Sequence, residues 1–333
     1  MSIRQRTRKL VDYCRYVSPA FLGITMMGIL DERRRRIFGG PYCRAIYALK
    51  DRMFQSFLYK QFGGWIEGWR KSPESAEAFA DPKEATIWVC WLQGEDAMPE
   101  FVKEMVDNIK KNANGHPVVV TSIDNIHEYV DIDTKYIQLY KRGKISAAFL
   151  SDVFRVNLLA SNGGLWLDAS VFVTKAIPDC IFAQPVWHAK GLDPHFVLEP
   201  KCVDITIFEG YFLAAQKKSL LMRFMKAFVD EYFRHYDVVL DYLLINHIAK
   251  IARENIKVIS QEFCQIPNNN QSCELLDGAL QGLNNENVSD LIRDSGTYVY
   301  KLSTRASYAE VQENGHSFAW NEFVKIWKED NHD

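Results

Sequence analysis

The chain has 333 residues, enough for one large α/β domain with appendages or for two domains, and its 47% hydrophobic and 25% charged residues are ordinary for a globular protein. This composition excludes a disordered chain, and no apolar run approaches the roughly 20 residues that span a bilayer. The seven cysteines are scattered without a Cys-x-x-Cys pair, and the basic N-terminus lacks the apolar core of a secretory leader. We therefore expect reduced thiols, no zinc site and a cytoplasmic location.

Charge is distributed unevenly along the chain. Residues 1–60 contain 13 basic and 4 acidic side chains, a net +9, whereas the rest of the chain carries −11. Residues 1–70 are predicted to form a helical region whose last helix ends at Gly63-Gly64. Its apolar run at 19–30 leaves two interpretations open: it lies in a membrane interface with arginines on anionic headgroups, or it packs on the main fold. Nucleic acid is not an expected partner, because the acidic remainder would repel a phosphate backbone.

A polar linker at 71–85 is predicted to precede a main domain at 86–333. The run TIWVCW at 86–91 is a predicted buried strand, and a predicted helix at 98–112 leads to a second buried strand at 117–123. Strand, helix and strand at this spacing form a βαβ unit, which requires a parallel sheet.

The alternation of helix and strand continues beyond this unit. A helix at 144–162 is predicted to stop at a Gly-Gly pair, one strand is predicted over 165–173, and a strongly amphipathic helix follows at 219–236. The expected fold is a Rossmann-type α/β domain with a mixed, mainly parallel sheet flanked by helices, to which the helical N-terminal region is added.

Three charged residues stand out in the stretch SDVFRVNLLASNGGLWLDAS. Asp152 and Arg155 are spaced i,i+3 between apolar residues, so they form either a surface ion pair or a pair at the boundary of a cleft. Strand alternation puts Asp168 on the face of Trp166 and Ser170, near the carboxyl end of its strand. A strand carboxylate needs a cation, donors or water, and ligands of α/β sheets bind beyond the carboxyl ends of strands; capping of a turn is the alternative role.

The segment SDVFRVNLLASNGGLWLDASVFVTKAIP resembles the core of the capsular polysaccharide synthesis glycosyltransferases, relatives of the glycosyltransferases with a DXD sugar-binding region. Members show Ser-Asp-x-x-Arg, a Gly-Gly pair and a short apolar strand ending in Asp-x-Asp or Asp-Ala-Ser/Thr. The segment IWVCWLQGEDAMPEFVKEMVDNIKKN is similar to the family's opening strand, Trp-x-Gln-Gly turn and helix. The resemblance covers residues 84–180 closely and extends loosely to YKLS at 300–303, with residues 1–83 outside it. It implies that Gly163 and Gly164 permit close approach of the backbone to a ligand.

The resemblance implies a GT-A type fold that binds a nucleotide-sugar and transfers its sugar. Trp91 and Gln93 would line the nucleotide pocket, and Asp152 and Arg155 would contact the sugar and phosphate portion of the donor. Asp168 would hold a divalent Mn²⁺ or Mg²⁺ on the diphosphate. These roles agree with the chemistry, because a diphosphate leaving group develops negative charge that a metal ion and an arginine stabilise.

The sequence departs from the Asp-x-Asp form of the motif at Ser170, where that form would supply a second carboxylate. A hydroxyl is a weak ligand for a hard cation, so metal dependence stays open. His316 is a further candidate metal ligand on a closing C-terminal loop, with an exposed tail histidine as the alternative. Lys301 and Arg305 are candidates to supply positive charge to the phosphates instead.

The acceptor side of the site is less defined. Glu209 and Asp241 are candidate bases, since an inverting transfer removes a proton from the acceptor hydroxyl; for Asp241 a plain charge at a helix N-terminus is the alternative. His188 and His195 flank a loop that contains glycine and proline and are candidates to face the site.

We therefore expect a nucleotide-sugar-dependent, hexosyltransferase-like glycosyltransferase of bacterial capsular or surface polysaccharide biosynthesis. Its partners would be the donor, a glycan acceptor carried on a lipid, and the anionic inner face of the cell membrane, which residues 1–60 would contact as a peripheral anchor. Two other functions stay open: a non-catalytic nucleotide-sugar-binding or scaffold component of a polysaccharide-assembly complex, and a sugar-phosphate transferase.

Overall fold

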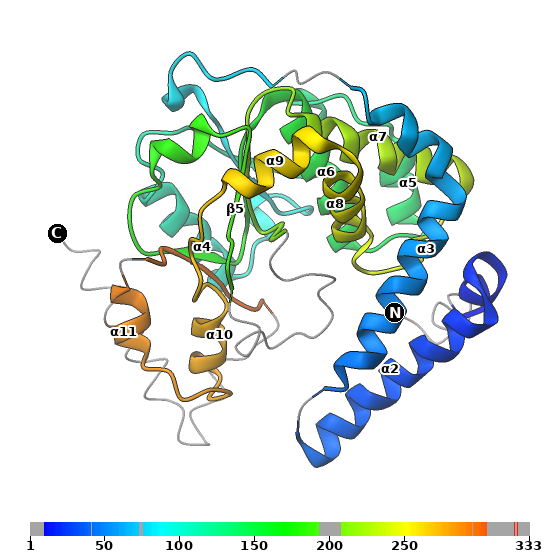
Figure 1. Ribbon diagram of the computed structural model, residues 1–333. Helices are drawn as coiled ribbons and strands as arrows, with labels where there is room; N and C mark the ends of the chain where they lie inside the picture. The colour runs from blue at the N-terminus through cyan, green and yellow to red at the C-terminus, as the bar shows by residue number, and fades with distance from the viewer. Residues whose placement is uncertain are drawn as a thin grey trace.

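Figure 1 shows the computed structural model of the chain, which describes residues 10–40, 42–72, 76–192, 208–294 and 296–304, together with residues 323 and 325. Three of the predicted site residues, His195, Arg305 and His316, lie outside the described residues.

A mixed β-sheet forms the centre of the fold. Within the described residues it has five strands in the order β2-β1-β3-β6-β5. β1 (Ile87–Cys90) pairs in parallel with β2 (Val118–Thr121) and with β3 (Gly164–Asp168). β6 (Phe212–Ala215) runs antiparallel to β3, and β5 (Val186–His188) runs antiparallel to β6. Four of these five strands therefore point in one direction, which confirms the predicted mainly parallel sheet.

Both faces of this sheet are buried, which explains why its central strands read as continuous apolar runs. Successive side chains point to opposite faces. Trp88 and Trp166 belong to a core cluster with α6 (Ala147–Asn162), α7 (Leu220–His235) and α8 (Leu244–Asn255). Val89 and Leu167 belong to a second cluster with α4 (Glu100–Lys111). Figure 1 shows these two helical layers on either side of the sheet.

The helices of the main domain follow the amphipathic segments of the sequence. They are α4 (Glu100–Lys111), α5 (Lys135–Lys141), α6 (Ala147–Asn162), α7 (Leu220–His235), α8 (Leu244–Asn255), α9 (Lys257–Gln265), α10 (Leu275–Leu280) and α11 (Val288–Arg293).

The predicted single strand over 165–173 is wrong, because the chain turns at Ala169 and Ser170. β3 ends at Asp168, and the next strand, β4 (Val171–Val173), leaves the central sheet. β4 pairs antiparallel with β7 (Val299–Lys301), and Val171 is the register partner of Lys301. The turn therefore brings Lys301 next to the end of β3.

The N-terminal helices form a hairpin. After a π-helical turn at Tyr13–Val17, α2 (Pro19–Phe38) begins at Ser18, whose Oγ accepts a hydrogen bond from Phe21 N at 3.0 Å, and α3 (Arg44–Trp69) returns beside it (Figure 1). None of the described helices has the length and apolar character needed to cross a membrane.

The second arm of the hairpin belongs to the main core. Phe54, Leu58, Phe62 and Ile66 of α3 are buried in the same cluster as α7 and α8. The predicted end of this helix at Gly63-Gly64 is wrong: α3 runs on to Trp69, because Trp65 and Trp69 pack against Phe224 of α7 with ring centroids 5.5 Å away. The domain boundary at residue 70 stays a prediction.

Candidate functional site

The carboxyl ends of β1 and β3 lie side by side and position the candidate site. Cys90, the last residue of β1, is the register partner of Asp168, the last residue of β3. The backbone N–H of Asp168 donates to the carbonyl of Tyr211 at 3.1 Å, so residues 209–211 run beside it. This is the edge at which α/β sheets receive their ligands.

Three donors surround the carboxylate of Asp168. Its Oδ1 accepts hydrogen bonds from Arg155 Nη2 and from Trp166 Nε1, both at 2.9 Å, and its Oδ2 accepts one from Lys301 Nζ at 2.8 Å. Burial would raise the pKa of Asp168, but Lys301 and Arg155 outweigh burial and hold this pKa below its usual range. The carboxylate is therefore ionised at neutral pH while 27% of the side chain stays exposed.

The Arg155 guanidinium is fixed on several sides. Its Nη1 donates to Asp152 Oδ1 at 2.6 Å, and its charge lies 5.0 Å from the ring centroid of Trp166. A Cβ at Gly210 would come within 2.6 Å of Nη1, so glycine is required there for the guanidinium to fit. Burial raises the pKa of Asp152 to about 6, against the opposing effect of Arg155. The predicted pair is thus a largely buried part of the site rather than a surface ion pair.

Lys301 lies between the two groups that were predicted to bind a metal. Its Nζ donates to Asp168 Oδ2 at 2.8 Å and to Ser170 Oγ at 2.7 Å. Asp168 and Ser170 therefore do not fit a divalent cation as arranged, because an ammonium group already fills the position between them. Among the described residues, no group of three or more His, Cys, Asp or Glu side chains could hold a metal ion.

The predicted nucleotide-pocket residues follow β1 at the same edge of the sheet. The backbone N–H of Trp91 donates to Thr121 O at 2.9 Å, and its indole donates to Ala97 O at 3.3 Å, so the turn that contains the exposed Gln93 is held beside β2. An aromatic ring and an amide thus lie at the edge that ends in Asp168.

The family model described as capsular polysaccharide synthesis protein matches residues 36–320. The chain belongs to the capsular polysaccharide synthesis protein family. A solved structure, PaToxG glycosyltransferase, is 16% identical to this chain and has a TM-score of 0.36, over 73% of this chain and 94% of that one. The search of curated proteins gave no match.

The family match extends further than the resemblance seen in the sequence, since it begins at residue 36 and includes all of α3. This start agrees with the packing of α3 into the main core.

The two glycines of the family motif lie at the opposite end of β3 from Asp168. A Cβ at Gly163 would meet Lys217 N at 2.6 Å, and a Cβ at Gly164 would meet Thr86 O at 2.2 Å. Both have positive φ, 64° and 102°. The structure thus gives both glycines a role in close packing of backbone at the end of α6, and their approach to a ligand stays a prediction.

The two candidate bases lie in different places. Glu209 is buried next to Gly210, and burial, followed by repulsion from Glu274, raises its pKa well above the usual range. Asp241 is buried in a separate group of charged side chains. Lys50 Nζ of α3 lies 2.5 Å from its Oδ2, and His247 Nε2 of α8 lies 3.8 Å from its Oδ1. Burial would raise the pKa of Asp241, but Lys50 and His247 lower it. Glu209 thus borders the site, whereas Asp241 is engaged between two helices.

His188 is a buried histidine of β5. Its Nδ1 lies 2.6 Å from Ala189 O, its ring packs near Phe263, and burial lowers its pKa to about 4. It is therefore uncharged at neutral pH.

Sequence reasoning missed two residues of the site. Trp166 was placed on the face of Asp168 but given no role, although its indole N–H donates a hydrogen bond to the carboxylate. Tyr211, whose ring centroid lies 5.9 Å from Lys301 Nζ, offered no local signal, because it reaches Asp168 only through the pairing of β3 with β6.

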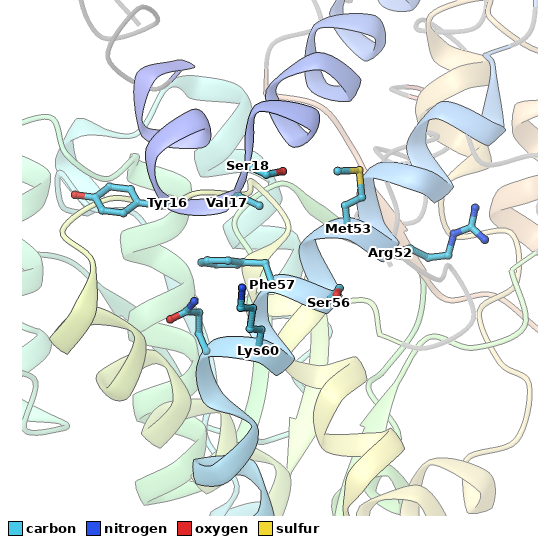
Figure 2. A pocket seen from close by; sticks show the side chains of 9 residues that line it. Tyr16, Val17, Ser18, Arg52, Met53, Ser56, Phe57 and Lys60 are labelled. Atoms are coloured by element: carbon cyan, nitrogen blue, oxygen red, sulfur yellow. The ribbon is translucent and has the colours of Figure 1, made fainter.

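A separate cavity of about 420 Å³ lies between the π-helical turn and α3, and none of its lining residues belongs to the Asp168 cluster (Figure 2). Figure 2 shows Phe57 and Lys60 projecting from α3 toward Tyr16. The lining residues are Tyr16, Val17, Ser18, Arg52, Met53, Ser56, Phe57, Lys60 and Gln61.

Proposed function

We propose that this chain is a glycosyltransferase of GT-A type that transfers a sugar from a nucleotide-sugar donor to a glycan acceptor in capsular or surface polysaccharide synthesis. Membership of the capsular polysaccharide synthesis family supports the pathway class. The observation that carries the donor site is the ionised Asp168 with Arg155 on one oxygen and Lys301 on the other, at the carboxyl edge of the sheet. The partly exposed ammonium of Lys301, with the buried guanidinium of Arg155 behind it, suits a diphosphate.

The proposed chemistry assigns charge stabilisation to these cations. When the bond between the sugar C1 and the diphosphate oxygen breaks, negative charge grows on the leaving nucleoside diphosphate. Arg155 and Lys301 are already oriented by Asp168, Asp152 and Ser170, so little reorganisation is needed as that charge develops. Asp168 is thus a positioning residue for both cations.

Glu209 is the proposed base on the acceptor side. It accepts the proton of the acceptor hydroxyl as that oxygen forms its bond to C1 in an inverting transfer. Its position beside Gly210, which contacts Arg155, supports this role. Its raised pKa makes it a better base than an ordinary carboxylate once it is ionised.

A thermal-shift panel of nucleotide-sugars tests the proposed function. A matching donor stabilises the fold according to its concentration relative to Kd, and slow release of nucleoside diphosphate shows turnover with water as acceptor. Asp168→Asn keeps the shape but removes the charge that orients the two cations, so we expect release to fall about 100-fold or more.

A panel without any stabilising donor would contradict the proposal. Binding without turnover under any condition would favour the non-catalytic module, and mass spectrometry of a phosphosugar product would favour the sugar-phosphate transferase.

We also infer that α2 contacts an anionic lipid surface. Eight of the ten exposed large hydrophobic residues in the described chain lie in residues 11–49, and four of them are in the middle of α2. The arginine run 33–36 follows on the same helix. Apolar side chains beside arginines match the charge and the apolar interior of such a surface. The exposed residues are Val11, Met26, Met27, Ile29, Leu30, Ile37, Phe38 and Leu49.

A further inference from the structure

The ammonium group of Lys301 makes the contacts with Asp168 and Ser170 that were predicted for a metal ion. Asp168 Oδ2 and Ser170 Oγ, the two oxygens at the ends of the Asp-Ala-Ser motif, lie 2.8 and 2.7 Å from Nζ. These are hydrogen-bond distances for an ammonium, which has three N–H donors. Two donors are used by these oxygens, which leaves the third for a ligand, and 31% of the side chain is exposed. Lys301 is therefore both anchored and accessible.

The backbone fixes Lys301 in this position. β7 pairs with β4, the Lys301 N–H donates to Cys273 O at 2.8 Å, and the N–H of Leu302 donates to Ser170 O at 3.0 Å. Ser170 thus holds the backbone at Leu302 and the side chain of Lys301 at once. The short serine side chain leaves the room that the ammonium occupies.

A divalent cation at Asp168 would meet unfavourable charges. It would have to displace Lys301 from Oδ2 while the buried Arg155 stays on Oδ1. Its remaining protein ligand would be a neutral hydroxyl, a weak ligand for a hard cation. Lys301 already supplies a positive charge at this position, so a divalent cation is disfavoured there.

We propose that Lys301 replaces the divalent metal ion at the donor diphosphate, so that the protein binds its donor without metal and the third N–H of Lys301 contacts a phosphate oxygen. This inference rests on the proposed function, because it assumes that the anion at the site is the diphosphate of a nucleotide-sugar.

The test measures binding of the nucleoside diphosphates of uridine, guanosine, cytidine, thymidine and adenosine to the full chain by titration calorimetry, with EDTA and with Mn²⁺. We expect at least one of them to bind equally in both conditions. Lys301→Met should weaken that binding by about tenfold or more, the usual effect of losing a charge-assisted hydrogen bond. Lys83→Met is the matched control, because the Lys83 side chain is similarly exposed at 37% and its Nζ lies 2.6 Å from Asp179 Oδ1. Lys83 is remote from the site, so this variant should bind as the natural chain does.

A second variant guards against a simple loss of fold. Ser170→Asp combined with Lys301→Ala restores two carboxylates and removes the competing ammonium, so binding should return only with Mn²⁺. If the natural chain binds only with Mn²⁺, the role of Lys301 is overturned while the donor site stands. If no nucleoside diphosphate binds in either condition, the proposed function fails together with this inference. Unchanged binding by Lys301→Met would also overturn it.

Discussion

At the residue scale, the buried carboxyl of Glu209 gives the clearest pH prediction. Burial and Glu274 raise its pKa, so it is largely protonated at pH values where an ordinary glutamate is ionised. Only the ionised form can accept a proton, so donor hydrolysis should rise with pH toward the raised pKa instead of levelling off above about 4.5. Glu209→Gln should lower the rate about 100-fold, remove this rising limb and leave nucleoside diphosphate affinity unchanged. A rising limb that persists in the variant would show that another group titrates.

The site residues whose proximity the sequence predicted lie close to one another along the chain. Asp152 and Arg155 share a helix face, and Asp168 ends the next strand, so three of the charges could be expected together. Lys301 was a candidate phosphate ligand, but its contact with Asp168 across 133 positions was not predictable. That contact depends on the pairing of β4 with β7, strands of three residues each whose partner choice has no sequence signal. Ser170 thus pointed to a missing carboxylate without revealing what fills its place.

At the element scale, two Gly-Gly pairs show why local signals misled. Both pairs were predicted to end a helix, and Gly163-Gly164 does so with positive φ at both residues. Gly63 and Gly64 instead lie inside α3, because apolar residues continue the helical pattern past them and pack on α7. The glycine signal is the same in both cases; the tertiary contact decides the outcome.

This difference predicts opposite effects of the same substitution. Gly164→Ala places a Cβ 2.2 Å from Thr86 O at a φ of 102°, so it should lower the free energy of unfolding by about 2–4 kcal/mol. Gly64→Ala meets no atom within 4 Å in a helix interior, so it should raise the free energy of unfolding by about 0.5–1 kcal/mol. Urea denaturation of both variants measures the two changes. Equal effects would mean that the close packing at Gly164 does not constrain the fold.

At the scale of the whole molecule, the two helices of the basic N-terminal region differ in what they contact. α3 packs on α7 and α8 as a helical part of the main fold. α2 contacts α3 and presents its exposed apolar residues, and Figure 1 shows it at the edge of the molecule, farther from the sheet than α3. Truncation of residues 1–70 would remove core residues of α3, so point substitutions in the full chain are the sound test of membrane contact.

Co-sedimentation with anionic vesicles measures this contact. Leu30 is 60% exposed on α2, and Leu30→Glu replaces an apolar group with a charge that anionic headgroups repel, so vesicle binding should fall about tenfold or more. Leu283→Glu makes the same change at a residue that is 62% exposed after α10, and it should leave binding intact.

Added salt should weaken binding of the natural chain, because salt screens the attraction between the arginines and the anionic headgroups. Equal loss in both variants would refute a role for α2. If the natural chain does not bind vesicles but self-associates, and Leu30→Glu abolishes that association, a second copy of the chain covers this face instead.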